Sequence, residues 1–331
     1  MKRLILTNNS SAAGGLGVAR LANFLISLER QLVWGRLPSH AELSGFFGVR
    51  KKRRSQLNWQ DYQPQHRLKG IGAVGLGLVE VCSRFDTIEL WMDPRPNDQV
   101  QLICLLDFLR AHPEIASRLS LVQAHVPMGG QTPEVLAKWK LPAVKISDAH
   151  FDLASRAWRA FGAATPQEWF GLLATDLSLL PRLRNAVTGL LKELPWRRTG
   201  LGATEMWMLE FISGDKTTPT NVFFHWARDS GRLFGYWEQG ALLDGLGRSR
   251  KPLVSGLKEG PFTMELHDDR ARSRRYFKSK LALTPLGSAV LAQTDDFTRH
   301  NPIRRWWGRT KLTNKHLWRW DPDNKTLIAP A

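Results

Sequence analysis

Residues 3–11 read RLILTNNSS, an apolar run followed directly by a polar cluster, and a helix-like apolar stretch follows at residues 16–28. The apolar run predicts a buried strand, and the polar cluster predicts a turn into a helix. This alternation continues along the chain. We expect further strands at Gln31–Trp34, Thr87–Met92 and Leu119–Gln123, and helices at Gly72–Arg84 and Asp98–Ala111. The pattern predicts an α/β domain over residues 1–130, with an open, mainly parallel sheet and flanking helices.

Two further segments are predicted after this domain. Leucines between Leu172 and Leu194 recur at spacings of one, three and four residues, so residues 131–195 are expected to form a helical extension packed on the α/β domain. Residues 195–202 are polar and contain Gly and Pro, which is typical of a boundary. The remaining residues, 203–331, predict an α+β domain. We expect helices at 204–212, 221–228 and 239–246, then a hairpin of strands 262–266 and 276–283 with a charged tip at 268–273, as in a winged-helix-like unit.

Charge is the unusual feature of the composition. The 331 residues carry 47 Lys and Arg against 30 Asp and Glu, a net charge of +17, which favours anionic partners. The two cysteines, Cys82 and Cys104, lie in apolar surroundings without zinc or redox spacing, and we expect buried thiols in a reducing compartment. Neither a signal peptide nor a membrane span is indicated, so the sequence predicts a cytoplasmic protein that does not enter a membrane.

The positive charge is concentrated in three segments. Residues 45–70 hold seven Lys and Arg with one acid, and residues 270–280 and 304–319 hold six each with no acid. Clustered cations are typical of nucleic-acid binding, because neutralised phosphates release counterions. The candidate binding residues for DNA or RNA are Arg50, Lys51, Lys52, Arg53, Arg54, Arg272, Arg274, Arg275, Arg304, Arg305, Arg309 and Lys311.

Two of the basic segments also have a structural interpretation. Residues 50–54 fit a solvated charge run in a loop. In the last segment, Trp306, Trp307, Trp318 and Trp320 offer stacking faces for unpaired bases, but tryptophans are usually buried, and packing in a C-terminal hairpin is the alternative.

A second candidate site follows the first strand. Open parallel sheets bind ligands beyond the carboxyl ends of their strands, where a helix N-terminus offers free N–H groups. The predicted ligand or anion site comprises Asn8, Asn9, Ser10, Ser11, Asp93, Asp98 and His125. The alternative is ordinary helix capping by Asn and Ser. Asp93 and Asp98 also fit a turn and a cap, no histidine pair has metal-ligand spacing, and the glycines at 14–17 miss the dinucleotide and Walker patterns. We therefore expect no metal and no cofactor, and assign no catalytic residue.

Scattered landmarks resemble the bacterial domain-of-unknown-function 1835 family with its uncharacterised C-terminal companion domain, over nearly the whole chain. The residues that carry the resemblance are Asn8, Ser11, Trp34, Leu90, Trp91, Asp98, Gln99, the segment 157–161, Leu194, Pro195, Gly200, Leu201, Glu205, Leu283, Thr284, Gly287, Trp306 or Trp307, Gly308 and the segment 318–321. The family pattern has acidic residues where this chain has Ser10 and, after Trp34, Arg36. If relatives use those carboxylates for catalysis, this chain lacks them, which favours a binding role.

The sequence thus favours a non-catalytic nucleic-acid-binding or regulatory protein, with a nucleotide or anion site in its first domain. Two alternatives stay open. An enzyme would hold a phosphorylated substrate over Asn8, Ser10 and Ser11, with Asp93 or His125 as base. A protein-interaction scaffold would meet an acidic partner with its basic surface. The sequence does not determine an oligomeric state.

Overall fold

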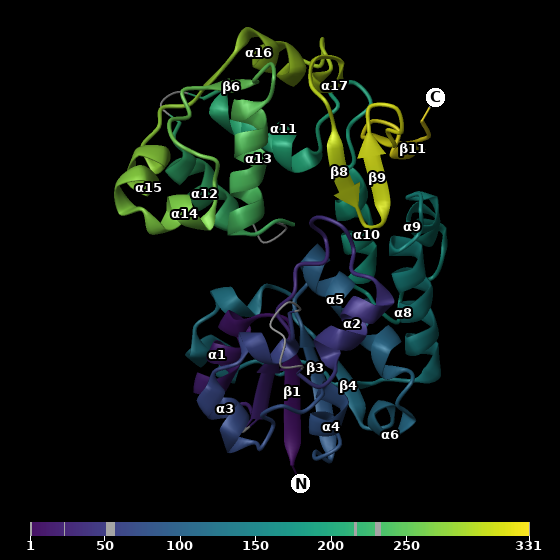
Figure 1. Ribbon diagram of the computed structural model, residues 1–331. Coiled ribbons are helices and arrows are strands. Elements are labelled where there is room, and N and C mark those ends of the chain that lie inside the picture. The colour runs from purple at the N-terminus through teal and green to yellow at the C-terminus, as the bar shows by residue number, and fades with distance from the viewer. Residues whose placement is uncertain (1, 23, 51–56, 215–216, 229–232, 331) are drawn as a thin grey trace. The chain divides into compact units, whose positions relative to one another are not determined.

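The computed structural model describes residues 2–22, 24–50, 57–214, 217–228 and 233–330. Its mixed α/β architecture confirms the predicted fold class (Figure 1). The chain forms two compact units, whose ranges differ from the three predicted segments. Unit 1 comprises Met1–Leu32, Leu37–Gly162 and Ala174–Ala186, and unit 2 comprises Val33–Arg36, Ala163–Leu173 and Val187–Ala331. No helix in the described ranges is long and apolar enough to cross a membrane.

Unit 1 is built on a five-stranded sheet of order β2-β1-β3-β4-β5. The first four strands pair in parallel, and β5 pairs antiparallel with β4. The strands form because their apolar side chains are covered on both faces, as in Leu4, Ile5 and Leu6, which are fully buried. The strands are β1 (Arg3–Thr7), β2 (Phe24–Ser27), β3 (Thr87–Met92), β4 (Leu119–Gln123) and β5 (Val144–Lys145).

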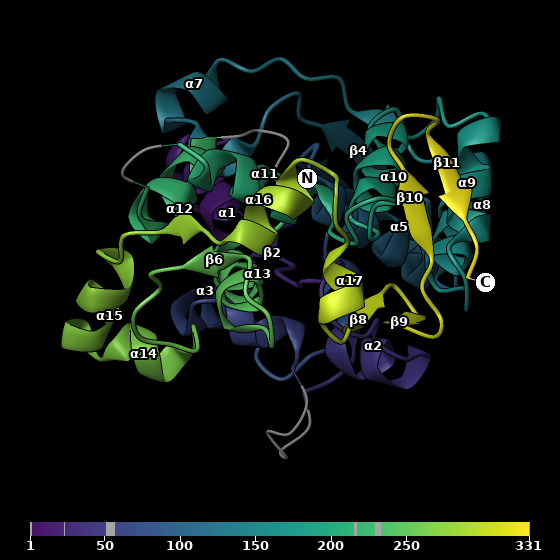
Figure 2. The ribbon, with the colours of Figure 1, turned by 90° about the horizontal axis from the view of Figure 1, so that it is seen from above.

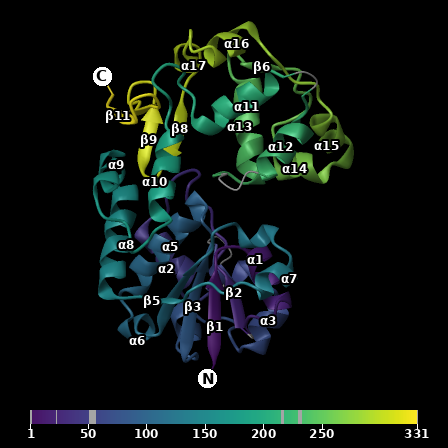
Figure 3. The same ribbon diagram turned by 180° about the vertical axis from the view of Figure 1, so that it is seen from behind.

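Helices cover both faces of this sheet (Figure 3). On one side α1 packs with the Met128–Gly130 turn and α7 over Ile5, Trp91 and Val122. On the other side lie α5 and α8, which contact each other. The helices whose residues fall in unit 1 are α1 (Ser10–Val18), α2 (His40–Phe47), α3 (Gln65–Gly70), α4 (Leu78–Cys82), α5 (Pro96–Leu109), α6 (Pro113–Ala116), α7 (Pro133–Ala137) and α8 (Asp148–Phe161). Both cysteines are buried free thiols, as predicted.

The structure corrects three predicted elements of unit 1. The predicted helix at 16–28 is wrong, because α1 ends at Val18 and residues 24–27 pair with β1 as the second strand. The predicted strand at Gln31–Trp34 is absent from the described structure, because the second strand of the sheet lies earlier in the sequence, at residues 24–27. The predicted helix at Gly72–Arg84 is reduced to α4, because Gly72 and Gly75 adopt φ of 62° and 81°, in the left-handed region that interrupts a helix.

Unit 2 contains the three helices predicted for residues 203–331. These are α11 (Ala203–Ile212), α12 (Pro219–Arg228) and α13 (Tyr236–Arg248). Helix α10 (Leu183–Lys192) precedes them in the sequence, with residues 183–186 in unit 1 and 187–192 in unit 2. Its other helices are α9 (Gln167–Gly171), α14 (Met264–Asp268), α15 (Arg270–Phe277), α16 (Pro285–Leu291) and α17 (Phe297–His300). Figures 1 and 2 show α12, α14 and α15 gathered beside α13.

The predicted hairpin of the winged-helix-like unit is wrong. Residues 264–268 and 270–277 are helical, because Asp269 caps α15 through its side chain and Tyr276 is fully buried in an aromatic cluster with Phe262 and Phe277. The antiparallel pairs of unit 2 lie elsewhere. They join β6 (Val254–Ser255) with β7 (Ala282–Leu283), β8 (Arg304–Trp307) with β9 (Thr310–Thr313), and β10 (Arg319–Asp321) with β11 (Thr326–Ile328).

Candidate functional site

Two neighbouring strands of unit 1 bring part of the predicted ligand site together. Asn8 and Asn9 follow β1, and Asp93 follows β3, its neighbour in the sheet. Asn9 donates from Nδ2 to Asp93 Oδ2 at 3.2 Å, and the Met128 N–H donates to Asp93 Oδ1 at 2.8 Å. Asp98, in the first turn of α5, is buried beside them. The sheet edge therefore holds two buried carboxyl groups surrounded by amides.

Burial raises the pKa of both carboxyl groups. The pKa of Asp93 rises because of burial, against hydrogen bonds from Met128 and the two asparagines. Burial, followed by the charge of Asp93, raises the pKa of Asp98 to about 7. Near neutral pH the pair thus holds a proton readily, as expected for two carboxyl groups in one low-dielectric site. Such a site does not attract an anion.

The N-terminus of α1 is already occupied by side chains. Asn9 Oδ1 accepts a hydrogen bond from the Ala12 N–H at 2.7 Å, and Glu29 Oε2 accepts from the Ser10 N–H at 3.3 Å. Ser10 and Ser11 are exposed. These contacts favour the helix-cap interpretation that the sequence left open, and the anion site stays a prediction.

His125 contacts a residue outside the carboxyl pair. It is exposed after β4, and its Nδ1 contacts the Arg182 guanidinium. Among the described residues, no group of three or more Asp, Glu, His or Cys side chains is arranged to hold a metal ion. Of the two candidate bases, Asp93 is therefore bonded to Asn9, whereas His125 contacts Arg182 instead.

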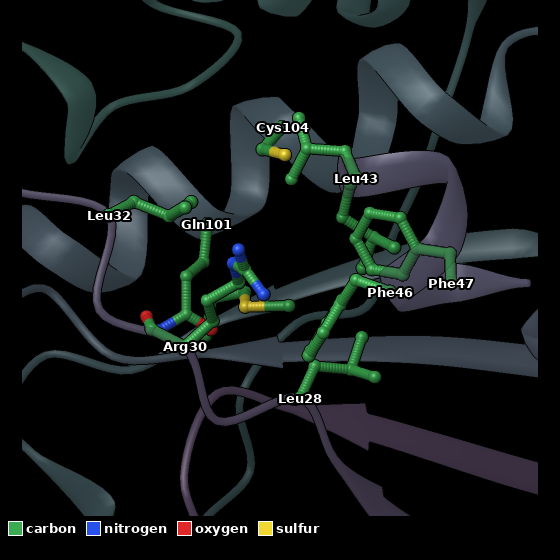
Figure 4. Close-up of a pocket in the computed structure, with 10 residues that line it drawn as sticks. Leu28, Arg30, Leu32, Leu43, Phe46, Phe47, Gln101 and Cys104 are labelled. Atoms are coloured by element: carbon green, nitrogen blue, oxygen red, sulfur yellow. The ribbon is translucent and has the colours of Figure 1, made fainter. Parts of the chain in front are cut away.

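A small cavity in unit 1 is too narrow for a substrate. Its volume of about 20 Å³ has room for roughly one water molecule. Figure 4 shows the Arg30 guanidinium among apolar side chains, and this group lies 4.7 Å from the centre of the Phe46 ring. Burial lowers the pKa of Arg30. The cavity is a packing feature rather than a ligand site.

The first basic segment is only partly described. Lys51, Lys52, Arg53 and Arg54 lie outside the described residues. Arg50 is paired with Asp61 at 2.7 Å.

Most of the second basic segment forms α15, whose cations lie on two faces, and Lys278 is the capping residue directly after the helix. Arg272 and Arg275 both bind Glu259, at 3.1 and 2.6 Å, so their charge is partly neutralised. Arg270, Arg274 and Lys278 are exposed and recur every fourth residue, and none of them has an ion-pair partner in the part of the chain that the structure describes. We call these three residues the α15 stripe.

The third basic segment is largely structural. Arg305 binds Glu205 through both guanidinium nitrogens at 2.8 and 2.9 Å, and Arg319 pairs with Asp296 at 2.8 Å. Trp307, Trp318 and Trp320 are buried, which agrees with the packing interpretation. Trp306 is 36% exposed, with Lys311 Nζ at 5.9 Å from its ring, and Arg304, Arg309 and Lys311 are exposed.

Unit 2 also contains a cavity of about 330 Å³ that the sequence did not indicate. This volume lies within the range of small-molecule sites. Its lining comes from the segment 33–35, α10, α11, α13 and the β8–β9 hairpin. The polar lining residues are Glu193, Glu205, Arg304 and Arg305, whereas the remainder is apolar or aromatic. No local motif could have revealed it, because its walls are far apart in the sequence.

Comparison of the sequence with models of known protein families and with curated proteins finds no match. The resemblance to the domain-of-unknown-function 1835 family therefore stays a prediction.

Proposed function

We propose that this protein binds nucleic acid through the α15 stripe of unit 2. The observation that carries the proposal is the spacing of Arg270, Arg274 and Lys278. Residues four apart share one face of a helix and lie about 6 Å apart along its axis. The stripe is thus a row of exposed cations suited to a phosphate backbone, the partner that binds clustered Lys and Arg by counterion release.

The helix dipole accounts for only part of this charge pattern. Asp269 caps the N-terminus of α15 and Arg274 lies in its last turn, and both are favourable positions for their charges. Arg270, the first residue of the helix, is instead opposed by the dipole, by about 0.3–1 kcal/mol.

The inner face of α15 holds the stripe in place. Tyr276 is fully buried, and Phe277 packs edge-to-face on Phe223, with ring centres 5.5 Å apart. Glu259 binds Arg272 and Arg275 from the preceding loop. A helix anchored this way presents its outward cations on a backbone that need not be ordered on binding.

The test is the salt dependence of binding to single- and double-stranded oligonucleotides, measured by fluorescence anisotropy. The triple variant R270Q/R274Q/K278Q should bind at least about tenfold more weakly at low salt. Its slope of log affinity against log salt should fall by about 3, one for each lost phosphate contact. Replacing Arg272 or Arg275 with Gln should weaken oligonucleotide binding less than replacing Arg274.

The matched control removes three exposed cations from unit 1, in K145Q/R156Q/R159Q. It lowers the net charge equally and should leave affinity nearly unchanged. Equal losses in both variants would reduce the effect to overall charge, and the absence of wild-type binding at low salt would refute the proposal.

A further inference from the structure

The cavity of unit 2 combines aromatic walls with buried ionisable groups. Trp34 and Trp306 line it and are 38% and 36% exposed, so each presents part of its ring to a ligand. Trp34 packs edge-to-face on Phe234 at 5.3 Å between ring centres, and Trp307 Nε1 donates to the Leu190 carbonyl at 2.8 Å. These contacts hold the aromatic walls in fixed positions.

The polar part of the lining is arranged around one carboxyl group. Glu205 and Arg305 neutralise each other through two hydrogen bonds. Glu193 is held by Thr204, whose N–H donates to Glu193 Oε1 at 3.1 Å and whose hydroxyl donates at 2.5 Å. A carboxylate has about four acceptor positions, so Glu193 keeps capacity for donors from a ligand. Arg304 is exposed and supplies a cation to the same lining.

These groups discriminate between classes of ligand. Because Glu205 and Arg305 neutralise each other, a lone anion would meet Glu193 and a simple ammonium ion would meet Arg304. A purely apolar molecule would displace water from Glu193 without offering a hydrogen bond in its place, and leaving a charged group without such a partner is costly. A flat heterocycle with N–H donors satisfies the aromatic faces and Glu193 together, and a phosphate attached to it matches Arg304.

We propose that this cavity binds a nucleobase carrying an exocyclic amino group. Carboxylates accept hydrogen bonds from the amino groups of bases, and aromatic side chains stack on every base. The base would come from a free mononucleotide or from an unpaired position in a strand. Only the second source rests on the proposed function, because the α15 stripe is not part of the cavity lining.

The first experiment follows tryptophan fluorescence and calorimetric heats as the purified full chain is titrated with AMP, CMP, GMP, UMP and short single-stranded oligonucleotides. We expect binding of the three amino-bearing nucleotides and at least about fivefold weaker binding of UMP, which lacks the amino group. Trp306→Ala should weaken binding about 5- to 100-fold, the range for loss of one stacked base. Glu193→Gln should remove the discrimination against UMP.

Trp237→Ala is the matched control. Trp237 is 38% exposed in the same unit, at the start of α13, but does not line the cavity. This variant should bind nucleotides as the wild type does. Equal losses in the Trp306 and Trp237 variants, or no binding of any nucleotide or oligonucleotide by the wild type at millimolar concentration, would overturn the proposal.

The outcomes separate the two sources and the two proposals. Mononucleotide binding that Trp306→Ala abolishes identifies a free ligand, whereas an effect seen with oligonucleotides alone identifies a strand base. If R270Q/R274Q/K278Q binds mononucleotides normally and the wild type binds no oligonucleotide, the cavity proposal holds and the stripe proposal fails. Oligonucleotide binding that depends on the stripe but not on Trp306 gives the reverse result.

Discussion

Each unit of this protein holds two acidic side chains close together, but the two units stabilise them differently. In unit 1, asparagine amides and the Met128 N–H donate hydrogen bonds to Asp93 and Asp98, and the positive charge of Arg95 acts on both carboxyl groups. In unit 2, Glu205 is paired with a guanidinium and Glu193 is held by Thr204. In each unit burial raises one pKa to about 7, that of Asp98 and that of Glu193, against the hydrogen bonds that these groups accept.

The space around the two pairs differs as well. Asp98 is 6% exposed and Asp93 is fully buried, and neither lines any described cavity. Glu193 and Glu205 line about 330 Å³ of open volume. A raised pKa therefore does not by itself mark a binding site, since burial alone produces it. The difference between the two pairs is that Glu193 and Glu205 line this cavity.

The largest expected effect comes from removing the guanidinium of unit 2. Arg305→Met leaves the Glu205 side chain, which is 4% exposed, without its charged partner. We expect a loss of about 3–5 kcal/mol in the free energy of unfolding, measured by urea denaturation, because an unpaired buried charge is costly. The double variant R305M/E205Q should recover most of this loss. A single variant as stable as the wild type would show that the pair is not energetically coupled.

The second prediction concerns the pH dependence of stability. Burial, then the charge of Glu205, raises the pKa of Glu193, against the Thr204 hydrogen bonds and the charge of Arg305. A carboxyl whose pKa is raised on folding binds more protons in the native state, so its contribution to stability falls as pH rises from about 4.5 to about 7. The fall is about 3 kcal/mol at most, since one pKa unit is about 1.4 kcal/mol. Glu193→Gln should remove this share of the slope in urea titrations between pH 4 and 8.

Asp98→Asn is the counterpart in unit 1, and it tests whether the two pairs differ in function. This variant should remove a comparable part of the pH dependence of stability, because burial is also the main cause that raises the pKa of Asp98. Nucleotide affinity should stay unchanged in this variant, whereas Glu193→Gln alters it. A loss of nucleotide binding in the Asp98 variant would instead assign ligand chemistry to the sheet edge.

The sequence predicted the sheet of unit 1 because its strands are apolar runs bounded by polar turns. Three of the four predicted strands of this domain form, at residues 3–7, 87–92 and 119–123. The second was placed wrongly because residues 16–28 are mainly apolar, and periodicity does not separate a short helix followed by a strand from one longer helix. Residues 24–27 form a strand because they pair in parallel with Leu4 to Thr7 of β1.

The C-terminal region shows a different limit. The segment 262–283 alternates like a hairpin, but Asp269 and the buried Tyr276 make it helical. The cavity of unit 2 has walls from residues 33 to 312, so only the tertiary structure brings them together. Sequence counting found the cations of α15 but could not separate the two that bind Glu259 from the three that do not, because Glu259 lies outside the charge run.

The smallest expected effect tests the anion site predicted at the start of α1. Asn9→Ala removes the cap that Ala12 uses and one donor to Asp93, and capping losses cost about 1 kcal/mol. If Asn9 is only a cap, phosphate should bind neither the wild type nor the variant. The variant should then lose the same amount of stability to thermal unfolding with and without inorganic phosphate. Carboxyl groups of Asp93 and Glu29 at this position favour that result. A ligand that binds only the native state raises its melting temperature by mass action. Protection of the wild type by phosphate that disappears in the Asn9 variant would therefore restore the anion site, and would show that the backbone N–H groups of α1 outweigh the carboxylates around them.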